Sequence, residues 1–437
     1  MADHSTFTVR EVKETSVSMT EAPAPIFRKL TDRKVRVLFV NTRSQIGADV
    51  AVHVTLIQNF PADEVEVHLV TNRNAVDLDK MRALMAELPH VRVQVVDLGN
   101  EMSIGQKNRI GKALSGLKNI GALLSVLRLS LYCRRHRIDV LHSTDRPRDA
   151  LFSTLLARLS GCPFLLHLHI MWYPEIGRWT NLALKQCSGV LAISQFTQRS
   201  LIDGGVPENK IHTVLNAINP ARFDPAKITP GLLRREWGVG KNTLLIGIVA
   251  RMIVWKGHLE LIEALAKVKT VFPDARLVIV GANASNTVEG SPYEESLKRR
   301  ICELDLTANV IWTGWHENMP AVMSDLDVLA VPSWEEPFGL VVTEAMAVGR
   351  PVVGYRSGGL PEIITEGVEG LLVPPKDITA LADALITLLG DPQLRAEMGR
   401  RGRRRVLQQF NPQRQCAEVA EVYRKIGLRR ESKGVNL

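Results

Sequence analysis

The sequence predicts an α/β protein of two Rossmann-like, parallel-sheet domains that face a central cleft. Short runs rich in Val, Ile and Leu alternate with longer helical stretches along most of the chain, which is typical of parallel sheets covered by helices. The runs form two series, separated by residues 219–241, which are rich in Pro, Gly and charge. The 437 residues are enough for two or three domains. Open parallel sheets bind ligands at the carboxyl ends of their strands, so we expect the binding site in the cleft.

The first series begins with Val35–Asn41, an apolar run that ends in a polar residue. Such runs predict buried strands, and further ones follow at 65–70, 91–96, 138–142, 164–169, 190–194 and 212–215, with a helix at 150–159. The second series has expected strands at 244–250, 276–281, 310–313, 328–333 and 351–354. Residues 1–34 lack the apolar core of a signal peptide, so we expect a flexible leader.

Composition narrows the function classes. Hydrophobic residues make up 45% and charged ones 23%, which excludes global disorder. The net charge of +9 favours an acidic partner: a nucleic acid, an anionic membrane or a phosphorylated substrate. Only 5% of residues are aromatic, so a stacking platform for nucleic acid is not expected. Five scattered Cys without a C-x-x-C pair indicate reduced thiols and a cytoplasmic protein, and no run of 18 apolar residues could span a membrane.

The segment 333–349 (SWEEPFGLVVTEAMAVG) carries the clearest chemistry. A buried strand is expected to end near Ser333 and a helix to begin near Phe338. Gly339 lets a ligand approach the helix start, whose N–H groups and dipole suit a phosphate or sugar oxygen. Glu336 and Glu344 could accept hydrogen bonds from sugar hydroxyls. The alternative is an ordinary connection with solvated acidic residues.

Several motifs occur in the order of a known family. They are EPFGLVVTEAMAVGRPVVG with Glu336 and Glu344, ARMIVWKG at 250–257, LAIS at 191–194, NAIN at 216–219 and the pair Gly358 and Gly359. Over residues 35–410 the chain resembles the family 4 retaining glycosyltransferases of the GT-B fold. The resemblance implies four segments after the leader: an acceptor domain at 35–225, a linker at 226–241, a nucleotide-sugar donor domain at 242–409, and 410–437, a helix and tail that pack back on the first domain.

The resemblance also implies roles for the residues of the 333–349 segment. Glu344 would accept hydrogen bonds from the ribose of the donor nucleotide, and Glu336 would contact the donor sugar. The main-chain N–H groups of Phe338, Gly339 and Leu340 would hold sugar and phosphate oxygens.

Two cations follow the first strand of the second series. Arg251 and Lys256 would neutralise the diphosphate leaving group, and fixed cations stabilise negative charge that grows in a transition state. A solvated basic pair is the alternative. His169 matches a family histidine that faces the donor. We expect His167 to point to the opposite face and pack in the core, and His142 to border the acceptor side.

The first turn of the chain departs from the family pattern Gly-Gly-Ala-Glu. Ile46 replaces the first Gly, Gly47 keeps the second, and Asp49 replaces the Glu. Gly47 could still present its N–H group to a phosphate or an acceptor, but the bulk of Ile46 changes the loop and with it the acceptor type.

Residues 101–137 contain eight basic residues and one acidic residue, with leucines at helical spacing. A basic amphipathic helix can rest on an anionic membrane surface, which suits a lipid-linked acceptor. The alternative is a crossover helix that docks on the sheet and exposes a solvated basic face.

No spacing of His and Cys in the sequence forms a ligand cluster. We therefore expect no catalytic metal and no cofactor, since the nucleotide sugar is a co-substrate. The expected function is retaining, metal-independent transfer of a hexose from a UDP-sugar or GDP-mannose to a hydroxyl of a saccharide or polyprenyl-linked acceptor in polysaccharide biosynthesis, at the inner face of the membrane. Two alternatives remain open: a nucleotide-sugar epimerase of the same fold, and a non-catalytic binding protein of a membrane polysaccharide assembly.

Overall fold

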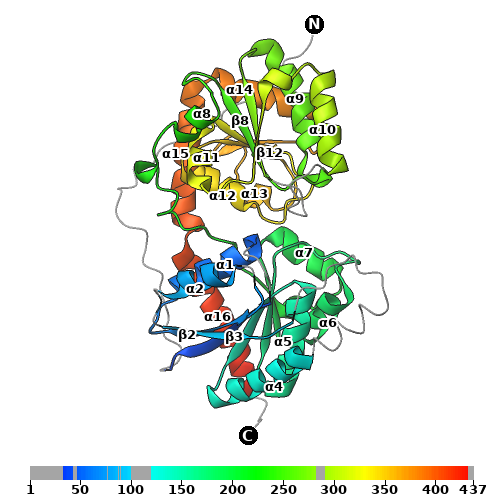
Figure 1. Cartoon of the computed structure of the whole chain (residues 1–437), viewed down its shortest axis with the longest axis vertical. Coiled ribbons are helices and arrows are strands. Elements are labelled where there is room, and N and C mark those ends of the chain that lie inside the picture. The colour runs from blue at the N-terminus through cyan, green and yellow to red at the C-terminus, as the bar shows by residue number, and fades with distance from the viewer. Residues whose placement is uncertain are drawn as a thin grey trace. The chain divides into compact units, whose positions relative to one another are not determined.

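The computed structural model describes residues 33–42, 47–75, 77–86, 88, 90–99, 120–281 and 291–431. The chain divides into two compact units. Among the described residues, the N-terminal unit combines those from 33 to 216 with 412–431, and the C-terminal unit consists of those from 217 to 411. Each unit is a sheet flanked by helices (Figure 1).

The N-terminal unit contains seven parallel strands among its described residues, in the order β3-β2-β1-β4-β5-β6-β7. From β1 the chain adds β2 and β3 on one side and then crosses back to add β4 on the other side of β1. Open α/β sheets hold ligands at such a switch in strand order. The strands are β1 (Val35–Asn41), β2 (Val65–Asn72), β3 (Val91–Val96), β4 (Val140–Thr144), β5 (Phe164–Leu168), β6 (Gly189–Ala192) and β7 (Ile211–Thr213).

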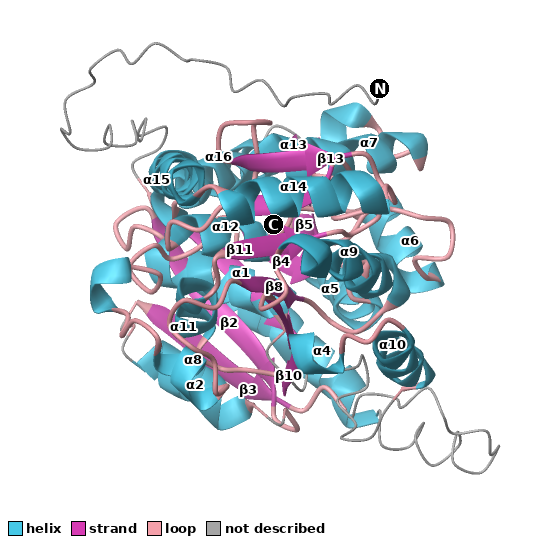
Figure 2. Ribbon diagram, turned by 90° about the horizontal axis from the view of Figure 1, so that it is seen from above, coloured by secondary structure: helices cyan, strands magenta, loops and turns pink. Residues whose placement is uncertain are grey.

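Helices cover both faces of this sheet (Figure 1), and Figure 2 shows the described helices in cyan and the strands in magenta. The last helix comes from the far end of the sequence, and its Val419 and Tyr423 share a core with Val37 and Phe39 of β1. The helices are α1 (Ala48–Asn59), α2 (Leu78–Ala86), α4 (Ile120–Arg135), α5 (Pro147–Ser160), α6 (Arg178–Gln186), α7 (Gln195–Asp203) and α16 (Pro412–Glu431).

The C-terminal unit repeats this topology with six strands in its described part, in the order β10-β9-β8-β11-β12-β13. Its switch in strand order lies between β8 and β11. The strands are β8 (Leu245–Val249), β9 (Arg276–Val280), β10 (Val310–Gly314), β11 (Val328–Val331), β12 (Val352–Tyr355) and β13 (Gly370–Val373).

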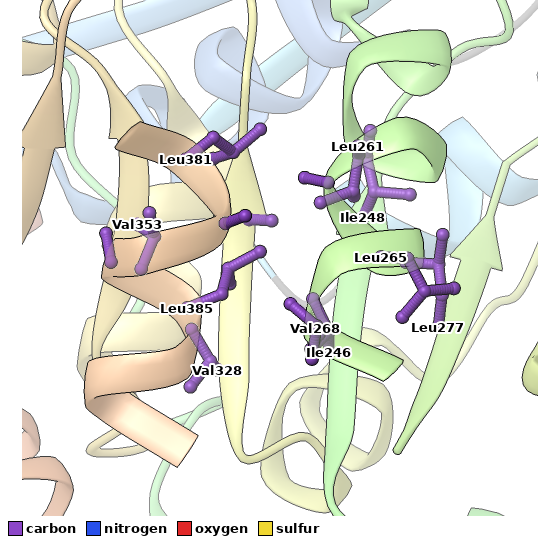
Figure 3. Packing of buried hydrophobic residues seen from close by; sticks show 14 of the residues in the cluster. Ile246, Ile248, Leu261, Leu265, Val268, Leu277, Val328, Val353, Leu381 and Leu385 are labelled. Carbon is purple, nitrogen blue, oxygen red and sulfur yellow. The ribbon is translucent and has the colours of Figure 1, made fainter. Parts of the chain in front are cut away.

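The core of the C-terminal unit lies between its sheet and two long helices. Leu261 and Leu265 of α9 pack beside Ile248 of β8, and Leu385 of α14 faces Val328 of β11 (Figure 3). These residues are buried completely or nearly so. The helices are α8 (Leu232–Glu236), α9 (His258–Val271), α10 (Pro292–Glu303), α11 (Met319–Asp325), α12 (Leu340–Ala347), α13 (Leu360–Ile363), α14 (Ile378–Gly390) and α15 (Pro392–Gln409).

The strands expected from the sequence all appear, most of them shifted by one or two residues at an end. Strand β13 was not expected, because its four residues follow a turn without a longer apolar run. The units divide after Asn216, so residues 217–241 group with the C-terminal unit and include α8. Residues 1–32 of the expected leader and 101–119 of the basic stretch lie outside the described residues. None of the described helices combines the length and hydrophobicity that a membrane crossing requires.

Candidate donor site and histidine cluster

The C-terminal unit places its charged side chains at the carboxyl ends of β8 and β11. After β8 the chain turns through a short 3-10 helix, Val254–Lys256, and directs the Lys256 ammonium at Glu336, which lies beyond β11. Lys256 Nζ and Glu336 Oε2 are 2.5 Å apart, and the two side chains are only 15% and 10% exposed. A hydrogen bond from Trp334 N to Trp255 O, 2.9 Å long, joins the two loops. The ion pair is therefore held by backbone contacts as well as by charge.

Two glycines shape the loop that carries Glu336. Gly358 has φ +58°, and a Cβ at this position would lie 2.1 Å from the Glu336 carbonyl oxygen. Gly359 N donates a hydrogen bond to that same oxygen at 2.7 Å. Only glycine lets the loop after β12 approach so closely, so the pair Gly358 and Gly359 fixes the backbone of Glu336.

Helix α12 begins directly after this loop, as the sequence indicates, although two residues later than Phe338. Gly339 caps it with φ +104°, and the buried Phe338 ring packs edge-on against Phe410 with 6.0 Å between centroids. Among the described residues, no acceptor is seen for the N–H groups of Phe338, Gly339 or Leu340. The first turn of α12 thus presents N–H donors beside the Lys256–Glu336 pair, where the helix dipole favours an anion.

Glu344 lies on α12, about one turn beyond Leu340, and its side chain is half-buried. Burial raises the pKa of Glu344 to about 7, and the positive charge of Arg222 partly offsets this rise. Arg222 is exposed. The carboxyl group is therefore close to half-ionised at neutral pH in the free protein.

Arg251 follows β8 and exposes its side chain to solvent. It belongs to the same strand end as Lys256, as its position in the sequence indicates. Gly47, by contrast, belongs to the N-terminal unit, where it precedes α1 with φ −96° and ψ −178°, an extended conformation. Its loop neighbours Ser44, Gln45 and Ile46 lie outside the described residues.

A second polar centre occupies the N-terminal unit. His53 of α1, His142 of β4, and His167 and His169 at the end of β5 form what we call the histidine cluster. His53 and His142 are nearly or fully buried, as is His167, while His169 is half-buried. His142 Nδ1 lies 2.5 Å from the hydroxyl oxygen of Tyr423 on α16.

The expectation that His167 and His169 point to opposite faces is wrong. Their ring centroids are 4.0 Å apart, because residues two apart in an extended chain share a face. The burial of His167 agrees with its expected place in the core. His142 is also fully buried, so in this structure it does not offer an open acceptor contact.

Burial keeps the histidine cluster neutral. It lowers the pKa of His53 to about 3 and that of His169 to about 4, and it lowers the pKa of His142 and His167 well below the usual value. The rings also disfavour one another's protonation, since a charge on one opposes a charge on the next. The four rings are therefore uncharged at pH 7, and each keeps a lone pair on one of its two nitrogens.

Carboxylates and one arginine surround the cluster. Asp49, in the first turn of α1, pairs with Arg146 at 2.9 Å. Asp145 Oδ2 accepts a hydrogen bond from His169 N at 3.3 Å, and burial raises the pKa of Asp145 to about 7. These contacts fix the backbone of His169 and the start of α1.

In the comparison with known proteins, each unit matches a glycosyltransferase family model. Residues 50–222 match the family model described as Glycosyltransferase Family 4, and residues 232–405 match that of Glycosyl transferases group 1. The chain belongs to glycosyltransferase family 4. It is 28% identical to N-acetyl-alpha-D-glucosaminyl L-malate synthase of Bacillus anthracis, over 66% of this chain and 75% of that protein.

Further relatives widen the range of chemistry within the family. The glycosyltransferase is 31% identical, over 53% of its own length and 61% of the other's, to a GDP-mannose-dependent phosphatidylinositol monomannoside mannosyltransferase of Mycolicibacterium smegmatis. The Anabaena HepE structure with UDP and glucose superposes with a TM-score of 0.70 at 24% identity, covering 89% of this chain and 99% of that one. Such neighbours show that the glycosyltransferase has the GT-B fold.

Sequence reasoning missed His53, Arg146, Tyr423 and Arg222. His53 follows Asp49 by one helical turn, a spacing that could have placed both on one face of α1. Tyr423 gave no signal, since it reaches His142 from a helix 281 residues further along the chain.

Proposed function

We propose that this glycosyltransferase transfers a sugar from a nucleoside-diphosphate sugar to a hydroxyl acceptor with retention of the anomeric configuration. One observation carries the proposal: Lys256 and Glu336 lie together at the carboxyl ends of β8 and β11 with the N–H groups at the start of α12, for which the described part of the chain offers no acceptor. A diphosphate needs cations and N–H donors, and a sugar needs carboxylate acceptors. The C-terminal unit offers all three at one place.

Each residue then has a distinct task. Lys256, with Arg251, would stabilise the charge that develops on the departing diphosphate, and the N–H groups of Phe338, Gly339 and Leu340 would hold its oxygens. Glu336 would exchange its contact with Lys256 for hydroxyls of the donor sugar. Glu344 would accept hydrogen bonds from the ribose.

The proposed transfer is a front-face displacement. The bond from the anomeric carbon to the phosphate oxygen breaks, the acceptor oxygen forms its bond on the same face, and the leaving phosphate takes the acceptor proton. His169 would donate or accept a hydrogen bond at the sugar or the diphosphate, and Gly47 would hold a phosphate or the acceptor through its N–H group. This scheme uses no metal ion.

The donor is proposed to be a UDP-sugar or GDP-mannose, because relatives and neighbours use or bind such compounds. We expect one nucleotide among UDP, GDP and ADP to raise the melting temperature, with a chelator present. Its sugar conjugate should be hydrolysed slowly to the free diphosphate, and with an acceptor the anomeric proton coupling of the product should show an α-linkage.

Other outcomes of this screen separate the alternatives. Interconversion of the sugar without release of diphosphate would identify an epimerase. Stabilisation by a nucleotide without any turnover of its conjugates would favour a binding protein. If no nucleotide shifts the melting temperature, the donor assignment is wrong.

We also propose that the acceptor is lipid-linked and met at an anionic membrane surface. The solvent face of α4 consists of leucines and arginines: Leu123, Leu124, Leu127 and Leu131 are 57%, 51%, 44% and 65% exposed, beside Arg128, Arg134 and Arg135. The helix contains no acidic residue. Exposed leucines among cations suit the boundary between acyl chains and phosphates.

Arg128 also lines a pocket of about 280 Å³ with Arg73, Ser125 and the acidic Asp97, a size that fits a phosphate headgroup. We expect the protein to sediment with vesicles that contain phosphatidylglycerol and not with pure phosphatidylcholine. Leu127→Gln with Leu131→Gln should reduce binding at least about tenfold, whereas Leu259→Gln, at a leucine 38% exposed on α9, should not. Equal binding by all three proteins would contradict a role for α4.

A further inference from the structure

The histidine cluster brings imidazole nitrogens close together although the spacing of these histidines in the sequence does not predict a metal site. One nitrogen each of His53, His167 and His169 lies within 4.8 Å of the other two. His53 Nε2 is 3.2 Å from His167 Nδ1 and 3.5 Å from His169 Nε2. His142 Nε2 lies 3.1 Å from the same His167 Nδ1.

Hydrogen bonding alone does not account for these contacts. Each imidazole nitrogen offers one in-plane position, either a proton or a lone pair. The four nitrogens form a chain of contacts, from His142 through His167 and His53 to His169, so at most two of the three contacts can be good hydrogen bonds. In that case the middle contact, between His53 Nε2 and His167 Nδ1 at 3.2 Å, is not a hydrogen bond.

A shared cation would account for both contacts of His53 Nε2, which one ring nitrogen cannot make as two good hydrogen bonds. Nitrogen ligands at about 2.0–2.1 Å from a tetrahedral zinc ion are about 3.3–3.4 Å apart, close to the separations of His53 Nε2 from its two partners. Imidazole is the ligand type that Zn²⁺, Ni²⁺ and Cu²⁺ prefer in proteins.

We propose that His53 Nε2, His167 Nδ1 and His169 Nε2 form a binding site for a divalent transition-metal ion of the zinc class. Two carboxylates lie near His169: Asp49, whose negative charge acts on the ring while the positive charge of Arg146 opposes it, and Asp145, which accepts a hydrogen bond from the backbone N–H group of His169. Because His169 is half-buried while the other two ligands are enclosed, the ion would enter from the side of His169.

The ion would act as an inhibitor rather than as a catalyst, and this step rests on the proposed function. Once it binds the metal, His169 Nε2 can neither donate nor accept a hydrogen bond at the donor, because its single in-plane position is occupied. A metal ion on the histidine cluster would therefore remove His169 from the transfer reaction. The site gives the enzyme a sensitivity to zinc that its own chemistry does not require.

Binding can be measured without any reference to activity. Untagged protein, stripped with a chelator, is titrated with Zn²⁺ against a chromophoric competitor, and Co²⁺ is used as a visible probe of tetrahedral nitrogen ligation. We expect one ion per chain with a dissociation constant below about 1 µM, and a loss of at least about 100-fold in His53→Gln and in His167→Gln.

The control is His258→Gln. His258 is a buried histidine of the C-terminal unit, and its two ring nitrogens have no hydrogen-bond partner among the described residues. Its replacement therefore tests the loss of a buried imidazole that lies outside the histidine cluster. Melting curves of all variants establish that they fold. The proposal is overturned if wild-type protein binds no ion below 1 mM, or if His53→Gln and His167→Gln bind it as wild type does.

Measuring turnover with and without Zn²⁺ distinguishes a failure of the metal site from a failure of the proposed function. Inhibition by Zn²⁺ that a chelator reverses would support both the site and the role of His169. Tight binding that depends on His53 and His167, without inhibition, would confirm the site and remove His169 from the reaction.

Discussion

Lys256→Ala is expected to lower kcat by at least about 100-fold, with a much smaller effect on KM. The lysine ammonium lies at the carboxyl end of β8, where the proposed diphosphate leaves, and charge develops there mainly in the transition state. Loss of one such preorganised electrostatic contact typically costs a factor of about 100–1000 in kcat. Steady-state kinetics with the donor identified by the nucleotide screen gives this number.

Removing Lys256 also leaves Glu336 without its partner at a position only 10% exposed, so melting curves must accompany the kinetics. Lys269→Ala serves as the matched control, because Lys269 also pairs with a carboxylate, Asp305 at 3.1 Å, but on the surface of α9. A folded Lys256→Ala protein with near-normal kcat would exclude Lys256 from leaving-group stabilisation.

Glu344→Gln is expected to weaken donor binding and to raise thermal stability at alkaline pH. The ribose contact requires the ionised carboxylate, which accepts hydrogen bonds on both oxygens, and glutamine offers one acceptor in its place. Calorimetric titration with the intact nucleotide sugar measures the first effect. Unchanged donor affinity would contradict the ribose assignment.

The pH dependence of donor binding follows from the same carboxyl group. Since the pKa of Glu344 is raised to about 7 in the free protein, donor affinity should fall as the pH drops and the group takes up its proton. Between pH 8 and pH 6 the dissociation constant should rise about tenfold. The diphosphate of a nucleotide sugar does not titrate in this range, and Glu344→Gln should show no such change.

Stability depends on pH in the opposite direction to donor affinity: the contribution of Glu344 to stability falls as the pH rises. The folded protein holds the Glu344 proton more tightly than the unfolded chain, whose pKa is near 4.5. The group therefore stabilises the fold below about pH 4.5, and this contribution is lost as the pH rises to 7. The melting temperature of Glu344→Gln should exceed that of wild type at pH 8 and approach it at pH 5.

Glu366→Gln is the control for the donor-binding measurements. Burial also raises the pKa of Glu366, yet it binds the backbone of β13 rather than lying on α12. Its replacement should leave donor affinity and its pH dependence unchanged. A difference in melting temperature between Glu344→Gln and wild type that shrinks from pH 5 to pH 8 would contradict the raised pKa of Glu344.

Much of the fold could be predicted from the sequence because parallel strands buried on both faces are continuous apolar runs. The bounds of β1 and β3 agree with the prediction, and β8, β9 and β11 lie within the expected ranges. Strand β13 was not predicted because its four residues are too few to show a hydrophobic periodicity. It is a strand through its pairing with β12, from Val352↔Gly370 to Tyr355↔Val373.

The residues proposed for the donor site of the C-terminal unit could be named from the sequence for a similar reason. Their loops follow predicted strands directly, so the carboxyl ends of β8 and β11 bring Lys256 and Glu336 to one edge of the sheet. What spacing could not give is that the two side chains form an ion pair at 2.5 Å. That contact depends on how tightly the loops approach, with Gly358 and Gly359 against the backbone of Glu336.

The sequence by itself determined the two α/β domains, the glycosyltransferase family and the residues of the proposed donor site, because each follows from short-range patterns and ordered motifs. Only the tertiary structure decided the histidine cluster. His53, His142 and His167 come from α1, β4 and β5, and Tyr423 joins them from α16. Strand order sets β4 beside both β1 and β5, and this pairing, which no local sequence encodes, places the four imidazoles in contact.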